Sequence, residues 1–227
     1  SVVATSQKYI ASSSVLSNLK QPPEFIANGI NKELDPASFQ QERKEYEKIY
    51  GQNFFLFLGV FRYYKGLNYL LEAAKHTGLK LVIAGDGPET EVLHRFVEEN
   101  SITNVYFLGY VSEQQKHALI DISKALILPS SERSEAYGMV LLEAARQGTP
   151  MISTELGSGT SYINAHNETG LVVSAKSSAQ LAAAMQDMVE NVEMVKLMSI
   201  AAKKRFNNHF TSERMGKRYA ELYSSLI

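Results

Sequence analysis

Strand-length apolar runs alternate with stretches of helix length along almost the whole chain, and this alternation most constrains the fold. Several runs, such as residues 54–58 and 81–84, are apolar on both faces. A strand that is buried on both faces belongs in a parallel sheet covered by helices. The expected strands span residues 2–5, 25–27, 54–58, 80–84, 105–108, 125–128, 151–153 and 171–173. The predicted fold class is therefore α/β, with a Rossmann-like, doubly wound parallel sheet.

The stretches between these runs carry the periodicity and the end signals of helices. One apolar stripe, with the spacing i, i+3, i+4 and i+7, consists of Leu67, Leu70, Leu71 and Ala74. Further helices are expected over residues 88–100, 112–121 and 211–226, the last two with capping residues at their starts. Ligands of a doubly wound sheet bind at the carboxyl ends of its strands, so we expect functional residues just after strands.

The alternation breaks at residues 28–51, which begin with the turn-forming pair Asn28-Gly29 and continue as a charged, polar stretch. We interpret residues 28–51 as a linker, residues 1–27 as the tail of a preceding domain and residues 52–227 as a domain. The chain opens at Ser1, without a methionine, and enters a strand at once. This opening favours a piece of a longer protein over a complete small protein with a trimmed start.

Composition argues against several classes of function. The chain has 23 basic and 24 acidic residues, so no overall field attracts it to nucleic acid. It has no cysteine, which removes disulfides and thiolate metal sites and fits a reducing compartment. Neither a signal peptide nor an apolar run of the ~18 residues that span a bilayer is visible. The five histidines are scattered and no Asp-x-Asp pair occurs, so we expect no metal site.

The loop after residues 54–58 is a candidate phosphate site. Gly59 permits a close backbone approach to a ligand, and Arg62 and Lys65 precede a helix. Cations beside a helix N-terminus attract anions, because the free N–H groups and the helix dipole add to the formal charges. A solvated turn with incidental basic residues is the alternative.

Two other strand ends carry weaker signals. Gly85-Asp86-Gly87 lacks the third glycine of a dinucleotide fingerprint, so it is better explained as a tight turn before a helix than as part of a dehydrogenase. Tyr110 follows the strand at 105–108, at an edge where a backbone turn could cradle a flat base.

The loop after residues 125–128 leads into a helix and carries two carboxylates, Glu135 before the helix and Glu143 within it. Eight residues at helical rise span at most ~12 Å, which suits two groups that grip opposite ends of an elongated ligand. The backbone amides of residues 137–140 lie between them, facing what should be an anionic middle. Glu143 also follows an apolar run, so a buried acid with a structural partner is the alternative.

On these residues the chain resembles the family 4 retaining glycosyltransferases with the GT-B fold. Glu135 and Glu143 reproduce that family's two glutamates separated by seven residues, and the likeness extends through Pro150, residues 167–173 and the helix at 210–223. The resemblance implies that residues 52–227 are the nucleotide-sugar donor-binding domain, one half of a GT-B fold. It also implies that residues 1–27 are the tail of the N-terminal acceptor domain.

The resemblance further implies a role for each candidate site residue. Glu135 would contact hydroxyls of the donor sugar, and Glu143 would hold the ribose hydroxyls. Arg62 and Lys65 would neutralise the departing diphosphate, which makes Arg62, Lys65 and Glu135 the catalytic set. Tyr110 would lie beside the base. The other donor-binding positions are Gly59, Ala136, Tyr137, Gly138, Met139 and Val140.

One departure from the family pattern is Val60, which stands where the family commonly has an arginine, so Arg62 would have to substitute for it. Residues 62–66 and 157–164 resemble segments of bacterial mannosyltransferases that build surface polysaccharide. This likeness favours GDP-mannose as the donor and a glycan or lipid-linked acceptor, with a UDP-sugar as the second choice. The alternative outside enzymes is a non-catalytic sugar-nucleotide-binding module of a larger polysaccharide-assembly protein.

The resemblance implies a cytoplasmic, metal-independent enzyme without a cofactor, in which cationic side chains do the work of a metal. The N-terminal domain would bind the acceptor, so we expect the 227-residue chain alone to bind a nucleotide sugar weakly and to transfer little. A basic cluster is better explained as a solvated helix face, with peripheral contact with the cytoplasmic face of a membrane as the alternative. The cluster consists of Lys203, Lys204, Arg205, Arg214, Lys217 and Arg218.

Overall fold

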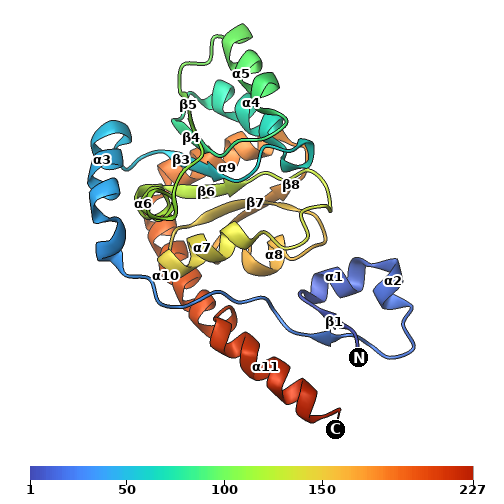
Figure 1. The fold of residues 1–227 in the computed structure, drawn as a ribbon. Coiled ribbons are helices and arrows are strands. Elements are labelled where there is room, and N and C mark those ends of the chain that lie inside the picture. Colours follow the sequence, from blue (N-terminus) through green and yellow to red (C-terminus); the bar gives the residue numbers. More distant parts are fainter. Residues whose placement is uncertain (227) are drawn as a thin grey trace.

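The computed structural model describes residues 1–226 and contains a six-stranded, all-parallel sheet between helices (Figure 1). Its strands are β3 (Phe55–Leu58), β4 (Leu81–Ala84), β5 (Val105–Gly109), β6 (Ala125–Leu128), β7 (Met151–Glu155) and β8 (Gly170–Ser174). They lie in the order β5-β4-β3-β6-β7-β8. The order reverses between β3 and β6, so the ligand crevice of such a sheet is expected at the carboxyl ends of these two strands. The predicted fold class is confirmed.

Alternate residues of the central strands feed two separate cores. On one face, Phe55 and Phe57 pack with α4 (Leu67–Thr77) and α9 (Ser178–Glu190). On the other face, Leu56 and Leu58 pack with α6 (Glu113–Ile122), α7 (Met139–Gln147) and α10 (Val192–His209). Because neither face meets water, these strands are apolar throughout, as the sequence pattern indicated.

The helical signals in the sequence are confirmed, with shifts of a residue or two at the ends. The apolar stripe of α4 is buried, and Ser112 and Gln115 form the capping box that starts α6. The Thr211 hydroxyl caps α11 (Ser212–Ser224) by accepting a hydrogen bond from the Arg214 N–H. α5 (Thr90–Glu99) begins two residues after Pro88, because a tight turn at residues 85–87 comes first.

Residues 28–51, where a linker is expected, contain the 3₁₀ helix η1 (Pro36–Phe39) and α3 (Gln40–Tyr50). α3 packs against α6, and Arg43 on α3 binds the Asp121 carboxylate at 2.6 Å. Few apolar residues anchor this region, mainly Phe39, Tyr46 and Tyr50. The polar composition therefore gave no sign of the helix, and the domain boundaries stay a prediction.

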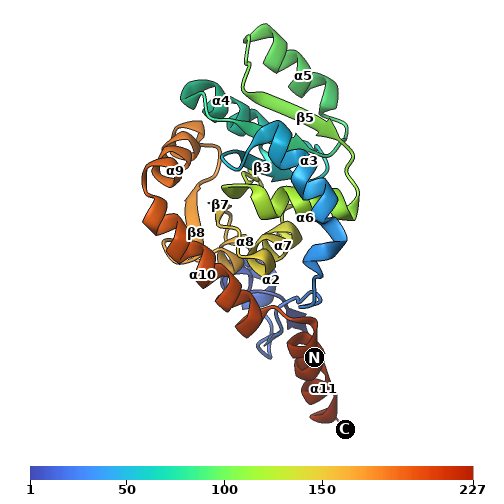
Figure 2. The same cartoon turned by 90° about the vertical axis from the view of Figure 1, so that its left-hand side faces the viewer.

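The first residues form a small unit of their own. β1 (Val3–Ala4) pairs in parallel with β2 (Glu24–Phe25), and α1 (Gln7–Ser12) and α2 (Ser14–Ser17) lie between them in sequence. α11 extends away from the body of the molecule (Figures 1 and 2). A Cβ on Gly29 would lie 2.4 Å from the Thr211 carbonyl oxygen, so only glycine fits where this segment passes the start of α11. Among residues 1–226, no helix is long and apolar enough to cross a membrane.

α1 is attached to the loops that follow β6 and β7. Lys8 binds the Glu155 carboxylate at 2.9 Å. The Ser12 hydroxyl donates to the Gly157 carbonyl oxygen at 2.6 Å and accepts from Arg133 at 2.9 Å. Residues 1–27 therefore contact the edge of the sheet where the predicted site residues follow their strands.

Candidate functional site

The loops after β3 and β6 are pressed together at the switch point of the sheet. Gly66 has φ +67°, and a Cβ on it would lie 2.1 Å from the Pro129 carbonyl oxygen. The Ser131 N–H donates to the Tyr64 carbonyl oxygen at 2.7 Å. Only glycine allows this approach of two backbones, and the approach brings the 3₁₀ helix η2 (Tyr63–Lys65) beside the loop that carries Glu135.

Lys65 and Glu135, both predicted as site residues, form a largely buried ion pair there. Lys65 Nζ lies 2.5 Å from Glu135 Oε2, and the two side chains are only 14% and 10% exposed. The Ser130 hydroxyl donates to the same carboxylate oxygen at 2.9 Å. Ser130 was missed from the sequence, although a polar residue directly after a buried strand is the signal that could have found it.

The backbone between the two glutamates turns sharply into α7. Gly138 has φ +84° and is the first residue before the helix, a conformation that favours glycine. The Gly159 N–H donates to the Ala136 carbonyl oxygen at 2.9 Å, which ties this turn to α8 (Thr160–Ile163). The N–H groups of the first helical turn, which includes Met139 and Val140, have no acceptor within the helix. The Leu141 N–H already donates to the Gly138 carbonyl oxygen at 2.9 Å. That the Met139 and Val140 amides bind an anion stays a prediction.

The side chain of Tyr137 has a structural role. It is 6% exposed, and its hydroxyl donates to the Asn28 carbonyl oxygen at 3.2 Å. Burial raises the pKa of Tyr137 far above its ordinary value of 10.0, so the phenol stays neutral. Only the backbone of Tyr137 is therefore available for the donor contact expected of this position.

Glu143 lies within α7 and pairs with Lys116 of α6, a residue that the sequence did not single out. Lys116 Nζ lies 2.6 Å from Glu143 Oε1 and 2.9 Å from Glu113 Oε2. Burial acts to lower the pKa of Lys116, but the hydrogen bonds to Glu143 and Glu113 outweigh it and raise the pKa. Glu143 thus has a structural partner, as the alternative interpretation of the sequence expected. Its side chain is nevertheless 23% exposed.

Within residues 1–226, no hydrogen bond or ion pair joins Arg62 or Tyr110 to either glutamate. Arg62 is exposed, and Tyr110 is 89% exposed. Gly59 has φ +149°, and a Cβ on it would meet nothing nearer than 3.7 Å, so a ligand could approach it. A hollow of about 430 Å³ is lined by α4 and α9 and contains none of these predicted residues. Among residues 1–226, no three His, Asp or Glu side chains gather as metal ligands would.

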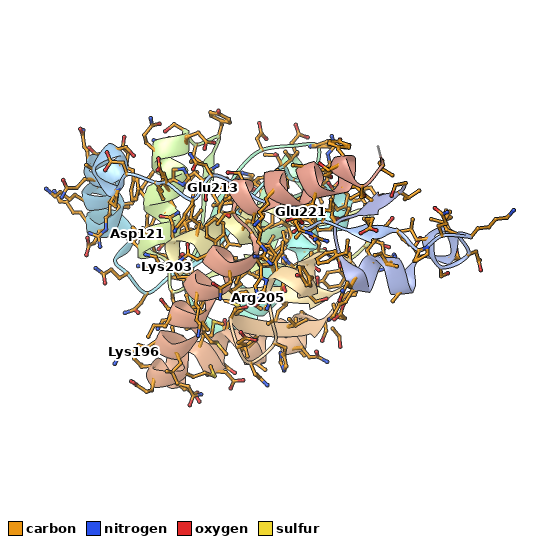
Figure 3. The ribbon with its side chains drawn as sticks, turned by 90° about the horizontal axis from the view of Figure 1, so that it is seen from below. Asp121, Lys196, Lys203, Arg205, Glu213 and Glu221 are labelled. Carbon is orange, nitrogen blue, oxygen red and sulfur yellow. The ribbon has the colours of Figure 1, made fainter. Side chains whose placement is uncertain are left out.

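The predicted basic cluster comes from α10 and α11, and one of its members, Arg205, is engaged by other groups. Figure 3 shows Lys196, Lys203 and Arg205 along α10. Arg205 does not belong to a free basic surface, because its guanidinium donates to the Tyr162 carbonyl oxygen at 2.6 Å and lies over the Tyr162 ring. Lys203 and Lys204 are exposed.

Known proteins are similar to this chain in sequence and in fold. Residues 38–205 match the family described as Glycosyl transferases group 1. The D-rhamnosyltransferase WbpZ of Pseudomonas aeruginosa is 42% identical over 211 residues, which cover 93% of this chain and 55% of that protein. The O-antigen chain mannosyltransferase C of Escherichia coli is 36% identical over 226 residues, which cover 100% of this chain and 61% of that protein. The chain therefore spans little more than half the length of these curated relatives.

Solved structures give the same picture of the fold. HepE of Anabaena in complex with UDP has a TM-score of 0.86 at 20% identity, over 99% of this chain and 63% of that one. The C-terminal domain of the group 1 glycosyl transferase LpcC of Francisella tularensis has a TM-score of 0.67 at 20% identity, over 79% of this chain and 100% of that one. Since the family match covers most of the sequence and both relatives exceed 30% identity, the chain belongs to the group 1 glycosyl transferases, with the half-GT-B fold that the resemblance implied.

Proposed function

We propose that the chain is the nucleotide-sugar-binding part of a retaining glycosyltransferase that uses GDP-mannose in polysaccharide biosynthesis. The observation that carries the proposal is the largely buried Lys65–Glu135 pair at the switch point of the sheet. Glu143 follows later in the chain, within α7. A buried ion pair adds little stability over apolar residues of the same volume. Its position at the ligand edge of the sheet is therefore better explained by function.

The names of the two relatives support a hexose of the manno series. One is a mannosyltransferase and the other a D-rhamnosyltransferase. D-Rhamnose is 6-deoxy-D-mannose, so the two sugars carry the same hydroxyls at C2, C3 and C4. In our proposal, Glu135 accepts hydrogen bonds from hydroxyls that both sugars have, and contacts around C6 decide between them.

The proposed chemistry assigns the cations to the leaving group. Cleavage of a glycosyl–phosphate bond builds negative charge on the diphosphate while the sugar passes through an oxocarbenium-like state. Lys65, Arg62 and the free amides at the start of α7 would stabilise that charge more in the transition state than in the ground state. Such groups make the reaction independent of a metal ion. The acceptor, a glycan or lipid-linked glycan, would bind to the part of the relatives that this chain does not cover.

Calorimetric titration of the 227-residue chain with GDP, UDP and GDP-mannose tests the proposal. We expect GDP to bind more tightly than UDP, and GDP-mannose to gain affinity over GDP that E135Q loses. E193Q, on the exposed face of α10, is the matched control. Preference for UDP would replace GDP-mannose by a UDP-sugar, and absence of binding by every nucleotide would refute the proposal. Efficient transfer by this chain alone would refute the expectation that acceptor binding lies elsewhere.

A non-catalytic sugar-nucleotide-binding module is the second candidate. Val60 favours it, because this residue is 51% exposed in the β3 loop where the family commonly has an arginine. Nucleotide-sugar binding by the full-length protein, with no transfer in wild type or in a V60R variant, would select this candidate.

A further inference from the structure

Lys116 has no role in the function proposed so far, yet it holds one of the two glutamates. Resting on the proposed function, in which Glu143 binds the ribose, we propose that Lys116 is a positioning residue. It fixes the Glu143 carboxylate for the ribose hydroxyls and so sets the preference of the site for ribonucleotides over 2′-deoxyribonucleotides. Lys116 Nζ donates to Glu143 Oε1 across 27 residues of sequence, from α6 to α7.

The contact with Lys116 occupies only one of the two carboxylate oxygens of Glu143. No residue among 1–226 donates a hydrogen bond to Glu143 Oε2, and the side chain is 23% exposed. An ionised carboxylate has about four acceptor positions on its two oxygens. The neighbouring 2′- and 3′-hydroxyls of a ribose can donate to it together, but only if the carboxylate keeps one orientation. Lys116 supplies that orientation at 2.6 Å from Oε1.

The base of Lys116 is rigid. It lies in the first turn of α6, where its N–H donates to the Ser112 carbonyl oxygen at 2.8 Å. The capping box of Ser112 and Gln115 fixes this turn. The ammonium group of a lysine on a rigid helix varies less in position than that of a lysine on a loop. Supporting residues on rigid elements can therefore hold a binding group in one orientation.

Lys116 stays a cation because Glu113 and Glu143 both bind it and together raise its pKa. The nearby arginine does not replace it. Arg146 lies one turn after Glu143 on α7, but its guanidinium donates to the Asn31 carbonyl oxygen at 3.1 Å and approaches His117 Nε2 at 3.5 Å. Lys116 is therefore the cation in contact with Glu143 in the described part of the chain.

The test is the ratio of affinities for GDP and 2′-deoxy-GDP, measured by calorimetry on the 227-residue chain. We expect wild type to prefer GDP by about tenfold, the value of one hydrogen bond to a charged group. K116M should bring the ratio close to one while binding of 2′-deoxy-GDP changes less than twofold. K116R should restore most of the preference. K196M is the matched control, because Lys196 also pairs with a glutamate three residues earlier on a helix.

Two failures can be told apart. If wild type and E143Q show the same ratio near one, Glu143 does not bind the ribose, and the proposed role of that site falls together with this inference. If wild type prefers GDP and E143Q does not, but K116M keeps the full preference, only the role of Lys116 is overturned. Circular dichroism establishes that each variant is folded, and K116Q provides a second neutral substitution.

Discussion

The site contains two lysine–glutamate pairs that are alike in chemistry and different in surroundings. Lys65 and Glu135 come from two loops, 70 residues apart, and are 14% and 10% exposed. Lys116 and Glu143 come from two helices and are 17% and 23% exposed. The first pair has a buried third partner, the Ser130 hydroxyl. The second has an exposed third partner, Glu113.

This difference in exposure leads us to expect a different cost when one member of each pair is removed. A desolvated pair cannot lose one member cheaply, because the remaining charge is left without water or a partner. A pair nearer to water is screened, so the loss of one member costs less. We infer that the loop pair keeps one fixed arrangement, whereas the helix pair can accept a ligand without reorganising the fold.

The largest expected effect is that of K65M. It leaves the buried Glu135 carboxylate without its cation, and we expect the free energy of unfolding to fall by about 3 kcal/mol. Urea denaturation measures the loss. The double variant K65M/E135Q should recover part of it, because no charge is then buried. A loss below about 1 kcal/mol in K65M would mean that water reaches this pair and that the two pairs do not differ.

K116M should cost about 1 kcal/mol in the same measurement, because the helix pair is closer to water and Glu143 can be hydrated. The ratio of the two losses tests the comparison directly. A loss in K116M equal to that in K65M would place both pairs in equally dry surroundings.

A third and smaller effect concerns pH near the helix pair. Burial, together with the charges of Arg146 and Lys116, lowers the pKa of His117 from its ordinary value of 6.5. Below that pH the unfolded chain binds more protons than the folded one. The free energy of unfolding therefore falls as pH drops from 6.5 toward the folded pKa, and this contribution is fully present above 6.5. In urea denaturation at pH 7.5 and pH 5.5, H117Q should show a smaller difference than wild type. Equal differences would contradict the assignment.

His209 sets the background for that experiment. Burial lowers its pKa as well, followed by the charges of Arg205 and Arg214. H117Q therefore removes only part of the pH dependence, and H117Q/H209Q should remove more than either single change.

The smallest expected effect links the pair to its neighbouring histidine. Lys116 lowers the pKa of His117 through its positive charge. K116M should therefore raise the pKa of His117, which the imidazole proton resonances report in an NMR titration. K65M, which alters the other pair, should leave it unchanged. A shift in K65M as large as that in K116M would show that the two pairs are coupled.

The strands, and their burial on both faces, could be predicted because the apolar pattern of each strand is local. Each strand of the sheet is a short apolar run, and each capping signal lies within a few residues of its helix. α3 was not predicted, because the few residues that pack it against the core, such as Tyr46 and Tyr50, are spread through a charged stretch. Local patterns identify elements only where burial is extensive.

The sequence named candidate site residues, which stay a prediction, but it did not report the contacts between them. Lys65 and Glu135 were both expected, but their contact depends on the backbone of Gly66 reaching Pro129, which no local pattern reports. No local pattern distinguishes Lys116 from an ordinary charged residue on a solvated helix face. Tyr137 was expected to offer its backbone amide, and the burial of its ring against the segment at Asn28 was not foreseen. In each case the deciding partner lies far away in the sequence.

The attachment of α1 to the loops after β6 and β7 has a consequence for engineered hybrids. Joining this chain at residue 28 to the N-terminal part of another group 1 glycosyl transferase would discard Lys8 and Ser12, and with them the bonds to Glu155 and Arg133. A junction placed ahead of residue 6 would keep these bonds. We expect the second hybrid to melt at the higher temperature, because it keeps the native contacts between α1 and the loops after β6 and β7. The first hybrid would have to form new contacts there.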